Sequence, residues 1–306
     1  MTNRADHPLV VLGPTASGKS ALALEIAETL GDVEIVSVDS MQVYRGMDVG
    51  TASPTAAERS RVRHHLVDLI DADTAFTVGE FQRHARAALA DIRERGRVPL
   101  LVGGTGLYLR AVIDDLELPG RFPDTYAALD AEPDTERLHA RLAELDPVAA
   151  ARMEPTNRRR VLRALEVTVG SGRPFSSFGP GMEEYGPSPF VQVALRWPRE
   201  VLDRRIADRY ERQLDEGFLD EVRRLAALGP SRTAAQALGY RELLRHVAGE
   251  VSRDEAVREA VLRTRRFARR QERWFRRDPR ITWVDMPVDA AALIEHWQRE
   301  SGLRGA

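Results

Sequence analysis

A single lysine, Lys19, stands in a segment whose residue types suit phosphate binding, although the chain has 45 Lys and Arg residues in all. The segment fits the pattern G-x-x-x-x-G-K-[ST], in which backbone N–H groups and a compact ammonium surround a diphosphate. A planar guanidinium would not fit inside such a loop, which explains a lone Lys in a chain that otherwise uses Arg. We therefore expect a diphosphate or nucleotide to bind Gly13, Pro14, Thr15, Ala16, Ser17, Gly18, Lys19 and Ser20.

The flanking sequence argues against the alternative of an ordinary Gly-rich turn with a surface lysine. Residues 8–12 are a short apolar strand leading into the loop, and residues 21–27 are a good helix leading out of it. The N-terminus of a helix favours anions, so the context fits a phosphate site.

Asp39 directly follows residues 33–38, a stretch rich in β-branched side chains, and is the main carboxylate candidate for chemistry. In nucleotide phosphotransferases a strand-end Asp beside the phosphate loop contacts Mg²⁺ or acts as a base toward the acceptor. The alternative is an Asp that caps the following turn. Residues 98–102 form another apolar strand, but it ends in residues 103–106, Gly-Gly-Thr-Gly, rather than in a metal-binding Asp.

Two further motifs are weaker signals. Residues 103–106 offer flexible backbone and the Thr105 hydroxyl, although a plain strand-to-helix turn has the same composition. His64 and His65 resemble a metal pair, but adjacent side chains rarely face one ion, and no third ligand stands at helical spacing. We expect a loop or core role for the two histidines.

Arginines are concentrated near the C-terminus. Residues 263–280 carry nine Arg against Glu272 and Asp278, a local net charge of +7 in a chain whose formal net charge is −2. An Arg row is usually a solvated face, but this excess favours a polyanion such as nucleic acid. At helical spacing the row contains Arg263, Arg266, Arg270, Arg273 and Arg277. A second cluster, Arg158, Arg159, Arg160 and Arg163, suggests a clamp around an extended ligand.

The composition excludes several classes of protein. The chain has 306 residues, 43% hydrophobic and 30% charged, which is ordinary for a globular protein. It has no cysteine, so disulfides, thiolate metal sites and thiol catalysis are excluded. There is neither an apolar run of about 18–20 residues nor the layout of a signal peptide, so we expect a cytoplasmic protein without membrane contact. We also expect a monomer.

Strands and helices alternate in the first third, which predicts an α/β fold with a parallel sheet flanked by helices, of the P-loop NTPase type. Ligands of such sheets bind at the carboxyl ends of the strands. The loop from Gly13, Asp39 and residues 103–106 all fall there. Between residues 117 and 189 strand runs vanish, and helices are expected at about 134–145 and 156–169. We predict a core of residues 1–116 and 190–306 with an all-helical insertion domain, 117–189. The C-terminal part of the core, residues 190–306, is expected to be mostly helical, with helices over about 199–228, 233–247 and from 252 onward.

Together these segments resemble one family, the bacterial tRNA dimethylallyltransferases, also called isopentenyl-tRNA transferases. The resemblance runs in order along most of the chain, and the long segment that starts at Asp39 is its most specific part. The matching segments are residues 13–20, 39–52, 64–68, 103–110, 159–166, 237–242 and 263–277.

The resemblance implies transfer of a dimethylallyl group from its diphosphate to N6 of the adenosine at position 37 of tRNA, beside the anticodon. It implies that Asp39 removes the N6 proton, that Thr105 and Arg209 are catalytic, and that Mg²⁺ binds near Ser20. Recognition of an anticodon loop requires the target base to leave its stack. The resemblance and the basic clusters together predict which residues contact tRNA. These are Asp39, Ser40, Met41, Gln42, Thr105, Arg158, Arg159, Arg160, Arg163, Arg266, Arg270 and Arg273.

Two other functions are consistent with parts of the sequence. A small-molecule or nucleoside kinase explains the phosphate loop and Asp39 but neither the Arg row nor the insertion. A GTPase-like RNA-binding switch needs a guanine motif such as N-K-x-D, and a chain whose only lysine is Lys19 cannot supply it.

Overall fold

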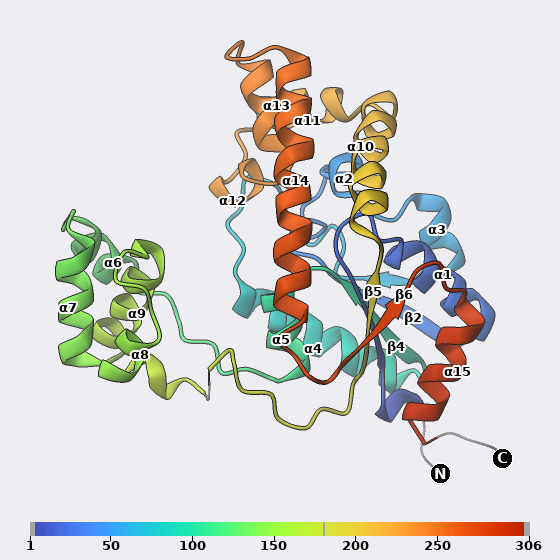
Figure 1. The fold of residues 1–306 in the computed structure, drawn as a ribbon, viewed down its shortest axis with the longest axis horizontal. Coiled ribbons are helices and arrows are strands. Elements are labelled where there is room, and N and C mark those ends of the chain that lie inside the picture. The colour runs from blue at the N-terminus through green and yellow to red at the C-terminus, as the bar shows by residue number, and fades with distance from the viewer. Residues whose placement is uncertain (1–3, 180, 303–306) are drawn as a thin grey trace. The chain divides into compact units, whose positions relative to one another are not determined.

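The computed structural model describes residues 4–179 and 181–302 and contains a parallel six-stranded sheet (Figure 1). The strands lie in the order β3-β2-β4-β1-β5-β6, and every neighbouring pair is parallel. This confirms the predicted fold class. The strands are β1 Leu9–Leu12, β2 Val33–Val38, β3 His64–His65, β4 Val98–Gly103, β5 Val191–Arg196 and β6 Ile281–Asp285.

Successive residues of β1 point to opposite faces of the sheet, and both faces are covered by helices. Leu9 and Val11 belong to the core packed against α1 and α15, whereas Val10 and Leu12 belong to the core beneath the other helices. Burial on both sides explains why the central strands are continuous apolar runs. The helices of this unit are α1 Lys19–Leu30, α2 Asp48–Thr51, α3 Ala56–Arg61, α4 Val78–Glu94, α5 Gly106–Ile113, α10 Arg199–Asp215, α11 Phe218–Leu228, α12 Arg232–Ala235, α13 Tyr240–Val247, α14 Arg253–Phe275 and α15 Ala290–Glu300.

Two helical stretches expected to be continuous are each broken at a glycine. The stretch 199–228 divides into α10 and α11 at Gly217, and the stretch 233–247 divides into α12 and α13 at Gly239. Both glycines have positive φ, 92° and 84°, which ends a right-handed helix at little steric cost. By contrast, α14 begins where predicted, at a capping box formed by Ser252 and Glu255.

The chain divides into two compact units, Met1–Asp114 with Pro187–Ala306, and Asp115–Gly186. The second unit is helical and has its own apolar core, which includes Leu142 and Leu165. Two of its helices, α6 and α8, were not expected from the sequence. The predicted borders of the insertion, residues 117 and 189, lie within three residues of the observed ones. Its helices are α6 Pro123–Asp130, α7 Thr135–Leu145, α8 Pro147–Ala151 and α9 Arg158–Ser171.

The first unit ends at Asp114, which a charged cluster holds in place. Arg280 donates to the Asp114 carboxylate at 2.6 Å and also to Asp278, and Arg110 donates to Asp114 from the preceding turn of α5. These ion pairs join Asp114 at the end of α5 to the segment that precedes β6. No helix in the described part of the chain combines the length and the apolar character that a membrane span requires.

Candidate active site

The phosphate loop connects β1 to α1, and α1 begins at Lys19. Gly18 caps the helix with a φ of 93° and supplies no side chain, so the N–H groups of the first turn face outward from an open helix end. Such an end, with its partial positive charge, is an anion site. The predicted loop therefore has the backbone form that diphosphate binding requires.

The Lys19 ammonium lies folded back over this loop, where its Nζ donates to the Pro14 carbonyl at 3.5 Å. Burial lowers the pKa of Lys19 to about 8; the Asp39 carboxylate opposes this shift, and the Arg209 guanidinium adds to it. Asp39 and Arg209 are thus close enough to Lys19 to act on its charge. Lys19 follows β1 and Asp39 follows β2, two strands whose carboxyl ends lie at the same edge of the parallel sheet.

Arg209 comes from α10, far along the chain, and reaches the phosphate loop with one arm of its guanidinium. Its Nη1 donates to Thr15 Oγ1 at 2.9 Å, and its Nη2 donates to the Gly50 carbonyl at 3.2 Å. Burial lowers its pKa, and the nearby Tyr210 and Asp39 side chains act in the opposite direction. The structure therefore brings Arg209 to the phosphate loop and to the Gly50 carbonyl, as a diphosphate ligand would need.

Asp39 and Thr105 stand at the ends of neighbouring strands, β2 and β4. Asp39 Oδ1 accepts the Met41 N–H at 2.8 Å, so the residue does cap the following turn, as the structural alternative supposed. The Thr105 hydroxyl accepts the Ser40 N–H at 3.3 Å and lies 3.4 Å from the Ser40 hydroxyl. Thr105 precedes α5 without capping it, so its hydroxyl is directed across the strand ends rather than used in its own helix.

The side chains of Gln42 and Met41 contact the protein itself and hold the segment after Asp39 in place. The Gln42 carboxamide accepts from the Ser37 hydroxyl at 2.7 Å and donates to the Ala52 carbonyl at 3.0 Å. Met41 packs against the main apolar core. Both predicted tRNA contacts therefore also have structural partners.

Gln271 of α14 joins two loops of the site, a role that the sequence did not indicate. Its Oε1 accepts the Thr15 N–H at 3.0 Å, and its Nε2 donates to the Gly104 carbonyl at 2.8 Å. Gly104 allows this approach, because a Cβ there would lie 2.4 Å from Gln271 Nε2. One buried amide thus holds the phosphate loop and the Thr105 turn together.

Trp197 and Arg205, also not predicted, support the loop carbonyls. Trp197 Nε1 donates to the Ser17 carbonyl at 2.9 Å, and Arg205 Nε donates to the Ala16 carbonyl at 2.8 Å. The Arg205 guanidinium lies 4.8 Å from the centre of the Trp197 ring. Together they fix the loop carbonyls, leaving the α1 end open to an anion.

Helix α14 presents three of its arginines on the face opposite its core contacts. Arg266, Arg270 and Arg273 are exposed, while Ala268 and Gln271 are buried. Arg263, expected in the same row, is instead paired with the buried Glu242 carboxylate of α13, because a buried carboxylate needs a cation. The basic face therefore begins at Arg266.

The insertion arginines fall into two pairs. Arg158 is bound to Asp130 at 2.9 Å, and Arg163 donates to the Pro119 carbonyl at 2.8 Å. Arg159 and Arg160 are exposed at the start of α9. The first pair thus has structural partners within this unit, and the second is presented to solvent.

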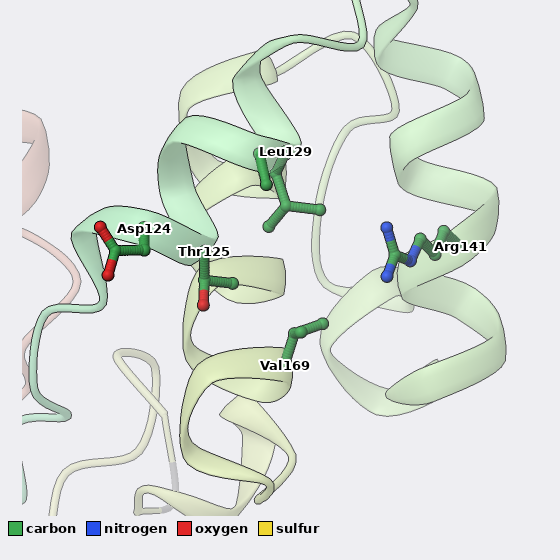
Figure 2. Close-up of a pocket in the computed structure, with 6 residues that line it drawn as sticks. Asp124, Thr125, Leu129, Arg141 and Val169 are labelled. Carbon is green, nitrogen blue, oxygen red and sulfur yellow. The ribbon is translucent and has the colours of Figure 1, made fainter.

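The insertion also contains a groove of about 360 Å³, shown in Figure 2. Leu129 and Val169 line it together with the polar Asp124, Thr125 and Arg141. It includes none of the predicted site residues.

His64 and His65 form the short edge strand β3, where His65 pairs with Glu34 at 2.7 Å. The described residues contain no group of three side chains suited to a metal ion.

Comparison with known proteins gives the family. The IPP transferase family model matches residues 42–278. A tRNA dimethylallyltransferase of Thermobifida fusca is 49% identical over 296 residues, 94% of this chain and 92% of that protein. A tRNA isopentenylpyrophosphate transferase of Bacillus halodurans superposes with a TM-score of 0.70 at 37% identity, covering 97% of this chain and 96% of that one.

A third comparison concerns the fold alone. A eukaryotic dimethylallyltransferase acting on tRNA superposes with a TM-score of 0.76 at 24% identity and covers 97% of this chain and 77% of that one. The identity and coverage of the bacterial relatives confirm the resemblance seen in the sequence. The chain belongs to the IPP transferase family.

Proposed function

We propose that this protein transfers the dimethylallyl group of dimethylallyl diphosphate to N6 of the adenosine at position 37 of tRNA and releases diphosphate. The observation that carries the proposal is that Lys19 and Arg209 both contact the phosphate loop, while Asp39 follows β2, whose carboxyl end lies at the same edge of the sheet. The names of the bacterial relatives support it. A diphosphate leaving group needs the cations, and an adenine nitrogen that loses a proton needs the carboxylate.

In the reaction, the adenine N6 forms a bond to the allylic carbon while the bond from that carbon to the diphosphate oxygen breaks. The open end of α1, Lys19 and Arg209 stabilise the negative charge that grows on the departing diphosphate. The allylic carbon tolerates positive charge, so N6 attacks with little prior activation. Asp39 accepts the N6 proton, and the Thr105 hydroxyl helps to hold the reacting groups near it.

Ser20 is the residue that would hold Mg²⁺. Its side chain is exposed in the first turn of α1, next to Lys19. The donor set fits an ion held largely by substrate oxygens and water, as Mg²⁺ commonly is, rather than by a closed cage of carboxylates. When bound, the ion would supply further positive charge to the diphosphate.

tRNA recognition follows from the exposed arginines. The α14 face with Arg266, Arg270 and Arg273 and the insertion pair Arg159 and Arg160 supply phosphate contacts, with further contacts from Arg158 and Arg163. The target adenine leaves the anticodon loop stack to reach Asp39. We further propose that the protein acts as a monomer in the cytoplasm.

The test is mass spectrometry of an unmodified tRNA pool incubated with the protein, dimethylallyl diphosphate and Mg²⁺. The proposal predicts a nucleoside with one dimethylallyl group at N6 and none in reactions without protein. A parallel reaction with ATP and small-molecule acceptors, without tRNA, tests the kinase alternative. Phosphorylated product there and unmodified tRNA in the first reaction would overturn the proposal.

A further inference from the structure

Glu221 is a buried carboxylate that the mechanism above does not use. It lies on α11, is 2% exposed, and accepts four hydrogen bonds. Its Oε2 accepts the N–H groups of Asp48 and Val49 at 2.8 and 2.9 Å. Its Oε1 accepts the Gly50 N–H at 3.0 Å and the Tyr240 hydroxyl at 2.5 Å. A buried charge is tolerated only with such partners, so this carboxylate defines where the short helix α2 lies.

The Gly50 turn is also fixed sterically. A Cβ at Gly50 would lie 2.2 Å from the Phe218 ring and 2.5 Å from the Tyr240 ring, so the backbone is pressed against both aromatic side chains. Gln213 Nε2 donates to the Gly50 carbonyl at 3.1 Å and to the Val49 carbonyl. The position and direction of the Gly50 carbonyl are therefore set from three sides.

That carbonyl is one of two groups that orient Arg209. One guanidinium nitrogen donates to the Gly50 oxygen at 3.2 Å, and another donates to Thr15 Oγ1 in the phosphate loop at 2.9 Å. A chain of direct contacts thus runs from Glu221 through Gly50 to Arg209 and the loop. A guanidinium held at two points presents its remaining N–H groups in one direction.

We propose that Glu221 is a positioning residue for diphosphate binding, acting through the Gly50 carbonyl on Arg209. The inference rests on the proposed function, because it assigns Arg209 to the diphosphate. Because Glu221 is buried and its oxygens bind α2 and Tyr240, its effect on the reaction would pass through Arg209. A purely structural role for Glu221 would affect all properties of the enzyme regardless of Arg209.

The test is a double-mutant cycle with Glu221→Gln and Arg209→Met, read by competitive inhibition with inorganic diphosphate at saturating tRNA. An amide replaces one acceptor oxygen by a donor facing backbone N–H groups, so Glu221→Gln should weaken diphosphate binding by about ten- to a hundredfold. The KM for tRNA should stay unchanged. In the Arg209→Met background, Glu221→Gln should cause no further loss. Equal losses in both backgrounds would overturn the inference.

Two further variants keep the test decisive if Glu221→Gln folds poorly. Tyr240→Phe removes one donor and keeps the carboxylate and the three amides, so it should cause a smaller loss that also disappears in the Arg209→Met background. Asp220→Asn changes an exposed neighbour on α11, paired with Arg223, and should leave diphosphate inhibition unchanged. A loss with Asp220→Asn equal to that with Tyr240→Phe would contradict the inference. If Arg209→Met alone leaves diphosphate binding intact, the inference is wrong. The proposed function is tested separately, by prenyl transfer by the unaltered protein in the same assay.

Discussion

At the scale of single residues, Lys19 is the group whose chemistry is least replaceable. Its ammonium lies folded back over the phosphate loop and donates to the Pro14 carbonyl, and a loop of this kind suits a compact cation. Lys19→Arg keeps the charge but introduces a planar fork. We expect transfer activity to collapse while thermal unfolding stays close to that of the unaltered protein. Turnover at the original rate would mean that the lone lysine reflects composition only.

The lowered pKa of Lys19 predicts how activity depends on pH. Burial brings this pKa to about 8, so the free enzyme loses the ammonium as pH rises through that value. The kcat/KM for dimethylallyl diphosphate, which reports the free enzyme, should therefore fall above pH about 8. Bound diphosphate favours the charged form, so the decline in kcat should lie at higher pH. Because the Asp39 charge raises the Lys19 pKa, Asp39→Asn should move the decline in kcat/KM to lower pH. If kcat/KM of the unaltered protein shows no decline near pH 8, the assignment to Lys19 is contradicted.

Asp39 is the proposed base, and the structure allows a conservative test. Asn at this position keeps the oxygen that accepts the Met41 N–H but cannot accept a proton. General-base catalysis typically contributes about 10²–10⁴-fold in rate. Asp39→Asn should lower the single-turnover rate constant for formation of the prenylated adenosine by that order, with substrate binding much less changed. A nearly unchanged rate would mean that the proton leaves to water or to the released diphosphate.

At the scale of elements, α14 serves both substrates in the proposed mechanism. Its inner face places Gln271 against the phosphate loop and the Gly104 carbonyl, and its outer face exposes Arg266, Arg270 and Arg273. A single rigid helix, 23 residues long, thereby carries groups for diphosphate binding and for tRNA binding.

The outer face predicts a salt-dependent affinity. Arg266→Ala with Arg270→Ala should raise the KM for tRNA and flatten its dependence on salt by roughly one unit of log–log slope for each arginine–phosphate interaction that the substitutions remove. The KM for dimethylallyl diphosphate should stay the same. Arg253→Ala with Arg258→Ala, two exposed arginines at the start of the same helix, is the matched control. An unchanged slope in the first variant would make this face a solvated one.

The elements also show what could be read from the sequence. Apolar strands and capping boxes are local patterns, so the strands β1, β2 and β4 and the start of α14 were predicted, whereas the short edge strand β3 was not. The breaks at Gly217 and Gly239 were missed because a glycine inside a helical pattern is compatible with either continuation or a stop. Gln271 was not predicted as a site residue, since its partners Thr15 and Gly104 are brought near only by the tertiary fold.

At the scale of the whole molecule, the first unit assembles its site from segments far apart in sequence. Topology alone predicted that the phosphate loop, Asp39 and Thr105 would meet, because the carboxyl ends of parallel strands share one edge. Arg209 came from the resemblance, since nothing local distinguishes it among the arginines of α10. Trp197, Arg205 and Glu221 could not be predicted, because their roles depend on contacts with backbone carbonyl and N–H groups, which no residue pattern records.

The most direct test of the central claim is a single-turnover reaction of the intact protein with unmodified tRNA and dimethylallyl diphosphate labelled in both its prenyl and diphosphate parts. We predict one prenyl group on N6 of adenosine 37 for each diphosphate released, with both products appearing at the same rate. Diphosphate release without prenylated adenosine, or prenylation at another nucleotide, would contradict the account.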